Sequence, residues 1–298
     1  MSQGQGIVQE LSLGDVFSKT FDYYRRDFTK YVMLFAVVEA VIGVLNTAIH
    51  QAIVLPTLPA QGATTKTFEN WAPHFFGSLI ELIGLTVIVI WLFYPIIYGS
   101  AVKMASNAIQ NGQADLGGSV RFVLSKVVWI WIVGIVVGII VFLGFIALVI
   151  PGIILVIMFS LVLPAMIIET PSFASLRRSR ELVSKRWLKT FALFIAFGIM
   201  IGIASVVVGL ISSPFGLGST VVSSILSALY LPLVPIMMTV YYYSNVARTS
   251  PVQAGVAPMT SGQGMVQVGT MKFCPNCGTQ LASAAMFCSK CGMKTDVV

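Results

Sequence analysis

The chain has 298 residues, of which 57% are hydrophobic and only 10% are charged. Soluble domains usually carry charge on about a quarter of their residues, so this composition, with a mean hydropathy of +0.90, excludes an ordinary soluble protein. Several apolar runs approach the ~20 residues that a helix needs to cross a bilayer. The alternating apolar and polar pattern of outer-membrane barrels is not seen in the sequence. The sequence therefore predicts an all-α integral membrane protein.

The hydrophobic runs predict six transmembrane helices. Only the sequence Ile150-Pro151-Gly152 separates the third run from the fourth. Proline fixes its own φ and has no N–H to donate, so we expect a tight hairpin there. The alternative is one long kinked helix, but that helix would be about twice as long as a bilayer is thick. The predicted spans are 31–54, 75–98, 127–150, 152–169, 190–211 and 220–244.

The positive charges fall on one side of these six spans. Lys66, between the first two spans, is the single cation among 18 that the predicted topology places on the opposite side. Lysine and arginine concentrate in cytoplasmic loops of membrane proteins. The net charge of +7 thus follows topology, and we expect a multi-pass protein of the cell membrane with both termini in the cytoplasm.

Three cytoplasmic segments that each precede a span have a similar pattern. Each begins with a helix-start signal, continues as an amphipathic helix and passes into a hydrophobic span. We therefore expect a threefold repeat of one interfacial helix followed by a two-span hairpin. The segments are 11–35, 115–133 and 171–195, and their start signals are Ser12, Asp115 and Ser172.

The third of these segments concentrates cations, and the first carries a smaller group. In an interfacial helix the apolar face lies in the membrane while long basic side chains reach water and the phosphates of anionic lipids. One interpretation of these cations is that they control the topology of the chain and anchor the helix at the membrane. Another is that they recognise a specific lipid headgroup or an acidic partner. Because the cations are spread along the chain and not gathered on one soluble module, we do not expect a nucleic-acid partner. The candidate membrane-surface residues are Arg177, Arg178, Lys185, Arg186, Lys189, Arg25 and Arg26.

Two residues of the third segment do not fit its amphipathic pattern. The apolar arc contains Phe173, and Arg180 falls inside this arc, whereas Leu182 falls on the polar face. A cation among apolar side chains either extends to water or pairs with an acid. Both alternatives stay open for Arg180, and its pairing with Glu169 at the end of the fourth span is the hypothesis that can be tested.

Acidic residues within the predicted spans are candidate functional groups, because a carboxylate in lipid is costly. Glu39 lies well inside the first span and Glu81 lies toward the outer end of the second; Glu169 ends the fourth. Two acids could form a path for protons or cations, especially where prolines break the spans. The alternative is a protonated glutamic acid that hydrogen-bonds to a neighbouring helix. The sequence contains no recognisable catalytic constellation, so we expect a protein that is not an enzyme.

The C-terminal tail contains all four cysteines, as two CxxC pairs separated by ten residues. Cysteine pairs at this spacing supply the four thiolates of a closed, structural zinc site, and a small module needs the metal to fold. An iron site or a redox dithiol is the alternative. We expect one Zn²⁺ and, from the few aromatic residues, a protein partner. The predicted ligands are Cys274, Cys277, Cys288 and Cys291.

Four regions follow from these patterns. They are a cytoplasmic segment with an amphipathic helix at 1–30, a six-span membrane domain at 31–248, an uncharged linker at 249–270 and a zinc ribbon at 271–298. The linker is rich in Gly, Ser, Thr, Pro and Gln, which is typical of flexible chain.

The run "IPGIILVIMFSLVLPAMIIETPSFASLRRSRELVSKRW" resembles the membrane-domain family of the glycerophosphoryl diester phosphodiesterases, and "LSLGDVFSKTFDYYRRDF" is similar to that family's N-terminal helix. The resemblance covers roughly residues 10–248 and implies a prokaryotic six-span protein. In family members with enzymatic activity the activity resides in a separate soluble domain, and nothing in this sequence resembles that domain. The matching residues are Pro151, Gly152, Pro164, Glu169, Ser179, Leu182 and Trp187.

The sequence favours two alternative functions. The first is a non-enzymatic membrane scaffold or complex subunit that presents a cytosolic zinc ribbon to a protein partner. The alternative is a transporter or lipid-handling protein that uses Glu39 and the proline-broken spans. The sequence leaves open whether the chain forms an oligomer.

Overall fold

The computed structural model describes residues 7–59, 64–169, 172–249, 272–273 and 280–281. The chain divides into two compact units, residues 1–250 and 251–298. The described residues of the first unit are helical, and those of the second form one pair of short strands. Each unit is described by itself below.

The first hairpin of long helices is preceded by a short separate helix, α1 (Leu13–Arg26). A capping box starts α1, in which Asp15 N donates to Ser12 Oγ and Ser12 N donates to Asp15 Oδ2; such reciprocal bonds satisfy N–H groups that have no partner within the helix. After Asp27 the chain continues as α2 (Phe28–Ala52). The first predicted helix start is therefore confirmed.

The partner of α2 in this hairpin is α3 (Thr65–Asn111), which is 47 residues long. The second span was expected to end at residue 98, but α3 continues for more than three further turns. Its last part is buried in protein and ends at Gly112, whose φ of 77° is the left-handed conformation that glycine adopts readily. Packing thus extends the helix beyond its apolar run.

The second hairpin joins α4 (Leu116–Ala147) to α5 (Val149–Met158). The hairpin was predicted correctly, but the turn is at Leu148, which has extended backbone angles, and not at Pro151 and Gly152. Pro151 is the third residue of α5, where its missing N–H has no helical partner to lose. Helix α4 is continuous from Leu116, so the segment at 115–133 does not form a separate interfacial helix.

The rest of the first unit contains the third hairpin and the helices around it. After α5 the chain forms the short helix α6 (Val162–Ile168) and then α7 (Ala174–Ser184). Helix α8 (Trp187–Ser212) leads through a 3-10 turn at Ser213–Gly218 into α9 (Ser219–Ser227). The last helix, α10 (Leu233–Thr249), begins after a break at 228–232.

Helix α10 lies at the centre of the first unit. Most of its residues are buried, including Ile236, Val240 and Tyr241, and α1, α3, α6 and α7 all pack against it. Phe17 of α1 also stacks on Phe197 of α8 with ring centroids 4.2 Å apart. The apolar side of α1 therefore contacts protein at Val16 and Phe17.

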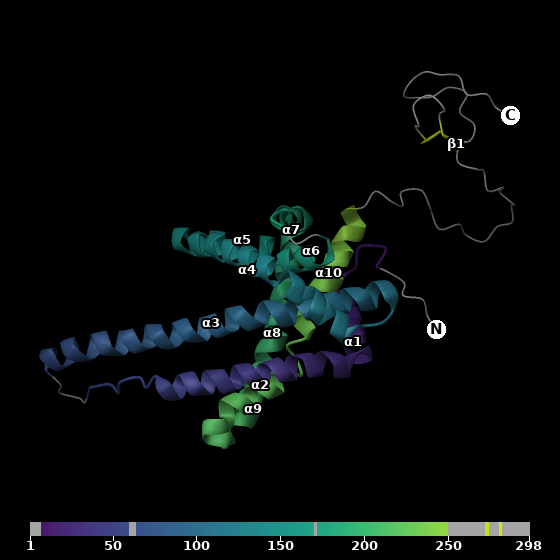
Figure 1. Ribbon diagram of the computed structural model, residues 1–298. Coiled ribbons are helices and arrows are strands. Elements are labelled where there is room, and N and C mark those ends of the chain that lie inside the picture. The colour runs from purple at the N-terminus through teal and green to yellow at the C-terminus, as the bar shows by residue number, and fades with distance from the viewer. Residues whose placement is uncertain (1–6, 60–63, 170–171, 250–271, 274–279, 282–298) are drawn as a thin grey trace. The chain divides into compact units, whose positions relative to one another are not determined.

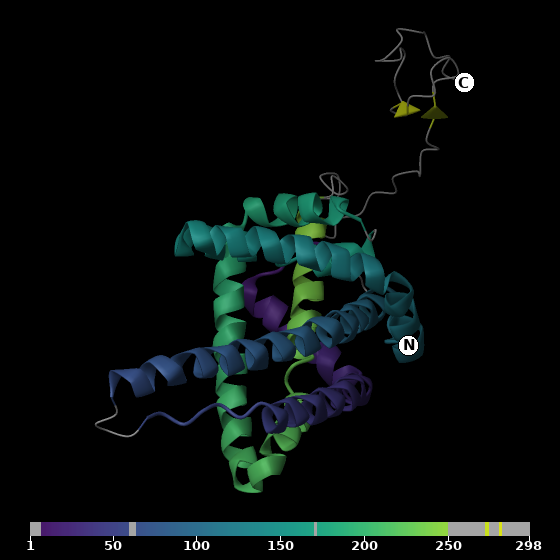
Figure 2. The same cartoon turned by 60° about the vertical axis from the view of Figure 1, so that its left-hand side comes forward.

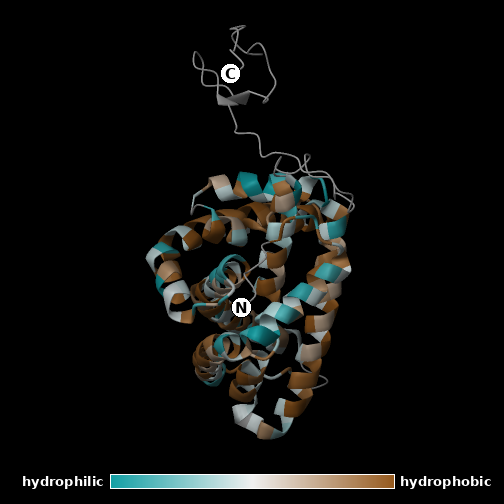
Figure 3. Ribbon diagram, turned by 90° about the vertical axis from the view of Figure 1, so that its right-hand side faces the viewer, coloured by the Kyte–Doolittle hydropathy of each residue, from teal (hydrophilic) through white to brown (hydrophobic). Residues whose placement is uncertain are grey.

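Five helical stretches among the described residues are long and apolar enough to cross a membrane. They are Phe28–Ala52, Thr65–Asn111, Leu116–Ala147, Val149–Ile168 and Trp187–Gly216. The sixth predicted span, 220–244, is divided between α9 and α10 by the break at 228–232. Most of the ribbon of the long helices has the colour of hydrophobic residues (Figure 3).

The long helices do not form a parallel bundle. Helix α2 lies along α3, while α8 crosses both at a steep angle (Figures 1 and 2). In both views α10 runs in nearly the same direction as α8. Helices that cross steeply diverge away from their contact point, which leaves spaces between α2, α3, α8 and α9.

The second unit contains two antiparallel strands, β1 (Lys272–Phe273) and β2 (Gln280–Leu281). Lys272 pairs with Leu281 and Phe273 pairs with Gln280. In the sequence, the first CxxC pair stands between these two strands. The four cysteines themselves lie outside the described residues.

Candidate functional site

A polar cavity of about 510 Å³ lies among α2, α3, α8 and α9. Its walls combine one carboxyl group, one amide and several hydroxyl groups with a few apolar side chains. The cavity lies within the apolar part of the unit, where polar side chains are costly unless they have partners. The polar lining residues are Glu39, Asn46, Tyr94, Ser205, Ser223, Ser224, Ser227 and Tyr230.

Glu39 is the acidic residue of this cavity and is only 3% exposed. Its Oε1 atom has no hydrogen-bond partner within the described part of the chain, and neither has Oδ1 of Asn46. The Tyr94 hydroxyl interacts with the Glu39 carboxyl group. Glu39 and Asn46 are seven residues apart on α2, so both lie on the same side of the helix. The cavity therefore contains two buried acceptor atoms that lack donors.

Three of the four serine hydroxyls in the cavity donate to neighbouring backbone. Ser205 Oγ donates to the Ile201 carbonyl at 2.9 Å and Ser227 Oγ donates to the Ser224 carbonyl at 2.6 Å. Ser223 Oγ likewise donates to the carbonyl of Thr220. Their oxygen atoms still have lone pairs that can accept. These three hydroxyl groups therefore offer acceptors to the cavity, and their protons are already used.

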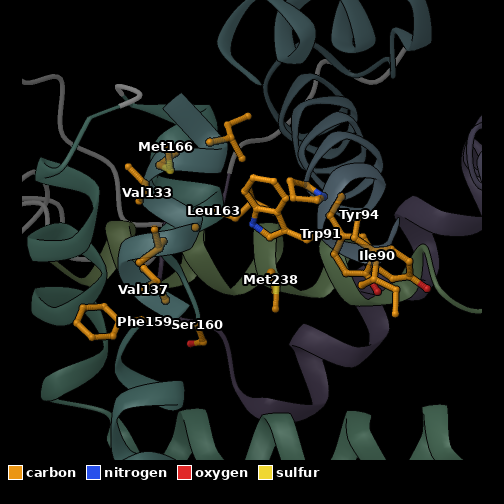
Figure 4. Close-up of a pocket in the computed structure, with 15 residues that line it drawn as sticks. Ile90, Trp91, Tyr94, Val133, Val137, Phe159, Ser160, Leu163, Met166 and Met238 are labelled. Atoms are coloured by element: carbon orange, nitrogen blue, oxygen red, sulfur yellow. The ribbon is translucent and has the colours of Figure 1, made fainter. Parts of the chain in front are cut away.

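A second, apolar cavity of about 380 Å³ lies between α3, α4 and α6. Figure 4 shows Trp91 and Tyr94 of α3 on one side and Leu163 and Met166 of α6 on the other. Ile90 and Tyr94 line this cavity and also the polar one. The two cavities therefore share one wall on α3.

Glu81 does not belong to either cavity. It is exposed on α3 toward that helix's N-terminal end, and the structure does not bring it near Glu39 in a shared lining. The two acids that could have formed a path are therefore separate. Sequence reasoning missed the other polar residues of the cavity, because such residues are common in membrane helices and only tertiary packing brings them together with Glu39. They include Tyr94, Tyr230 and three of the four serines of α9.

A second group of polar contacts surrounds the C-terminal half of α10. Four consecutive residues of α10 make hydrogen bonds to four different segments. Tyr241 and Thr190 share a hydrogen bond of 2.8 Å, and the Tyr242 hydroxyl donates to Glu169. Tyr243 shares a hydrogen bond with Ser106, and Ser244 Oγ accepts from Leu11 N. These contacts hold α1, α3, α6 and α8 to one end of α10.

Glu169 pairs with a different arginine from the one in the sequence-based hypothesis. Nε of Arg178 donates to Glu169 Oε1 at 2.8 Å, whereas Arg180 is exposed. The expected polar face of α7 was wrong at Leu182, which is fully buried in protein, whereas Phe173 of the expected apolar arc is 51% exposed. The buried side of α7 contains Ser175 and Ser179, whose small side chains allow the helix to approach α5 and α6 closely.

The segment before α1 is attached to the start of α8 by charge. Glu10 accepts from Lys189 Nζ at 2.7 Å and from Arg186 at 2.9 Å, and Lys189 also donates to the Leu11 carbonyl. Burial tends to raise the pKa of Glu10, but the two cations outweigh it and hold the pKa below its usual value. Arg186 and Lys189 thus form ion pairs within the protein.

The remaining predicted surface cations have mixed environments. Arg26 donates to the Ala108 carbonyl at 3.1 Å and pairs with Asp27. Arg177 pairs with Glu181 one turn away, at 2.7 Å, which holds the pKa of Glu181 below its usual value. Arg25 and Lys185 are exposed.

The tail is the part of the chain that comparison with known proteins identifies. Residues 273–295 match the zinc-ribbon domain family, and this match includes all four predicted ligands. Four thiols in two CxxC pairs form a donor set that suits Zn²⁺. No family match was found for the membrane part, and no curated protein or solved structure matches the chain.

Proposed function

We propose that this chain is a non-enzymatic, six-span protein of the cell membrane that presents a cytosolic zinc ribbon to a protein partner. The observation that supports this proposal best is the zinc-ribbon match at residues 273–295, at the end of a chain with five helices able to cross a membrane. Four cysteine ligands leave no open position on the metal, so the zinc is structural and Cys274, Cys277, Cys288 and Cys291 hold it.

The proposed topology counts α9 and α10 as one broken sixth span. Contacts between loops support an even number of crossings, because Leu11 N, before α1, bonds to Ser244 near the end of α10 at 2.8 Å. Arg248 at the end of α10 also donates to the Leu182 carbonyl of α7. The segments with most of the cations thus contact one another, and the positive-inside rule assigns that side to the cytoplasm.

The exposed sides of α1 and α7 are proposed to lie at the headgroup level of anionic lipids. Arg25, Arg177 and Lys185 are exposed there, and each cation near an anionic leaflet contributes on the order of 1 kcal/mol. The resemblance of residues 10–248 to the membrane-domain family of glycerophosphoryl diester phosphodiesterases is consistent with this arrangement. Phosphodiesterase activity is not part of the proposal.

The orientation can be tested in a background with the four tail cysteines replaced by serine. A membrane-impermeant maleimide should label Lys66→Cys in intact cells, and it should label Lys185→Cys only after permeabilisation. Labelling of Lys185→Cys in intact cells would overturn the proposed topology.

If the chain presents the zinc ribbon to a protein partner, that partner should bind only when the ribbon is folded. After cross-linking in cells, the partner should copurify with the intact chain and with Ser283→Ala, a tail variant that keeps all four thiols. It should be lost with Cys277→Ser and with a 1–250 truncation. Identical partners for all four proteins would contradict the proposal.

A second candidate function, transport or handling of a lipid, is favoured by one specific observation. Glu39 is buried, has an unpartnered oxygen and lines a polar cavity of about 510 Å³. The break at 228–232 contains Pro232, and Pro235 follows in the first turn of α10. This break lies beside the cavity, because Tyr230 and Leu231 line it. If this function holds, Glu39→Gln should reduce lipid movement between leaflets in reconstituted vesicles, and Glu81→Gln should not.

A further inference from the structure

We infer that the two adjoining cavities form one binding site for an amphiphile with a primary ammonium head and an alkyl chain. The head lies in the polar cavity beside Glu39, and the chain lies in the apolar cavity beside Trp91. This inference rests on the second candidate function, since it names the class of lipid that such a protein would bind. It does not depend on the zinc ribbon.

The geometry of the two cavities favours one ligand across both. Ile90 and Tyr94 line both cavities, so the two cavities adjoin at these side chains, and one ligand that fills both would pass Tyr94. Tyr94 has an apolar ring and a polar hydroxyl group, which suits the boundary between a polar head and a hydrocarbon chain.

Hydrogen-bond capacity identifies the head as a donor. Within the described chain, Oε1 of Glu39 and Oδ1 of Asn46 lack donors, and three of the four serines of the wall donate to backbone carbonyls. Because Ser205 donates to Ile201, the Tyr230 hydroxyl supplies the proton in its 3.0 Å bond with Ser205. A buried acceptor without a donor costs free energy. An ammonium group offers three donors and no acceptor, which meets this excess.

Charge points to the same head group. Glu39 is acidic, and neither cavity has a lysine, arginine or histidine among its lining residues. A phosphate or carboxylate head would therefore face Glu39 without a compensating cation, and like charges at low dielectric repel strongly. The rings of Tyr94 and Tyr230 can also attract a cation through their faces.

The apolar cavity fits an alkyl chain. Its lining is almost entirely aliphatic, aromatic and thioether side chains, with Trp91, Leu163 and Met166 facing one another across it (Figure 4). Apolar surface of this kind gains when a chain replaces water, at roughly 25 cal/mol for each Å² buried.

Binding can be measured with the full-length protein in phosphatidylcholine nanodiscs. The probe is octadecylamine carrying bromine at carbons 9 and 10, which quenches the fluorescence of nearby tryptophan. Trp131 stacks on Trp91 with ring centroids 5.6 Å apart, so both rings report binding. We expect saturable quenching that is at least about tenfold tighter than for the matching brominated alcohol, because a charge-assisted hydrogen bond contributes more than one decade in affinity. Replacing both tryptophans with phenylalanine should remove most of the saturable signal.

Two pairs of matched variants test the head and the chain separately. Glu39→Gln should weaken the amine about tenfold or more and leave the alcohol unchanged, whereas Glu81→Gln should change neither. Gly134 lines the apolar cavity and a Cβ there would meet nothing within 4 Å, so Gly134→Leu should fill the cavity without displacing protein. Gly138 is equally open but outside the lining, and Gly138→Leu should not alter binding.

The inference is wrong if the amine binds no better than the alcohol, if Glu39→Gln does not weaken it, or if Gly134→Leu and Gly138→Leu bind the amine equally. These failures differ from failure of the second candidate function. Lipid movement that requires Glu39 without amine selectivity would reject the ligand class alone, and selective amine binding without lipid movement would support the site and reject transport.

Discussion

Nε of Arg178 lies 2.8 Å from Oε1 of Glu169, and the Tyr242 hydroxyl donates to the same oxygen. One carboxylate oxygen thus joins the end of α6, the middle of α7 and the buried helix α10. The Arg178 and Glu169 side chains are 29% and 39% exposed, so water screens the pair partly. The contact therefore sets the position of α7 against α10, and its contribution to the free energy of unfolding is small.

Replacing both members of this pair should cost less than the sum of the two single replacements. For Arg178→Gln and Glu169→Gln we expect a coupling of about 1 kcal/mol, because a partly exposed ion pair contributes little beyond that. Thermal unfolding of the four proteins in detergent measures it. Arg180→Gln is the matched control, since Arg180 is exposed, and its effect should add to that of Glu169→Gln. Coupling of Glu169 to Arg180 and not to Arg178 would contradict the structure.

The error over Arg180 has a physical explanation. The sequence pattern predicted only a membrane-facing apolar arc around Phe173 and a polar face that included Leu182. The structure also gives α7 a side buried in protein, where the Ser179 hydroxyl donates to the Met158 carbonyl at 2.7 Å and accepts from Leu161 N. A small hydroxyl residue that bonds to a neighbouring helix can thus define a buried face, and hydrophobicity alone does not detect it.

Local sequence signals predicted helix starts and hairpins more successfully than they predicted contacts between distant helices. Ser12 and Asp115 cap α1 and α4 as expected, because each side chain accepts a backbone N–H of the helix's first turn. The break between α9 and α10 and the two cavities depend on packing between helices that are distant in sequence. Glu39 could be singled out as costly in lipid, but its partners could not.

The attachment of the N-terminal segment should depend on pH through Glu10. Lys189 and Arg186 hold the folded-state pKa of Glu10 below the value of 4.5 that an unperturbed glutamate has. The folded state therefore gains stability above about pH 4.5, and this gain is lost as the pH falls through the lower, folded-state pKa. The melting temperature should drop more between pH 6 and pH 3 for the native chain than for Glu10→Gln.

Equal acid sensitivity of the two proteins would show that the Glu10 contacts do not contribute to stability. Asp22 on the exposed side of α1 provides a control, because it is not among the ion-paired residues of the described chain. Asp22→Asn should retain the acid sensitivity of the native chain.

Metal analysis should find one zinc ion per chain. Cys277→Ser should lower the zinc content well below one, because a three-thiolate site loses much of the ~10–16 kcal/mol that structural zinc sites provide. The helical content by circular dichroism should stay unchanged, since residues 1–250 form a separate compact unit. Iron in place of zinc, or full zinc content in Cys277→Ser, would refute the predicted ligand set.

The contact between α2 and α9 should be intolerant of any side chain at Gly43. A Cβ there would lie 2.9 Å from Ser224 Cβ and 3.1 Å from the Val221 Cα, and the second of these atoms is backbone that can move only with α9. Gly43→Ala should therefore destabilise the protein by about 1–3 kcal/mol, although alanine favours helices over glycine. Gly198→Ala on α8 is the control, because its Cβ would meet nothing within 4 Å, and it should be neutral or stabilising by up to ~1 kcal/mol. Thermal unfolding in detergent compares them, and equal stability of the two variants would show that α2 and α9 are not in close contact.

Because these helices also form the wall that holds Glu39, Gly43→Ala should weaken binding of the amine probe as well, whereas Gly198→Ala should leave it unchanged.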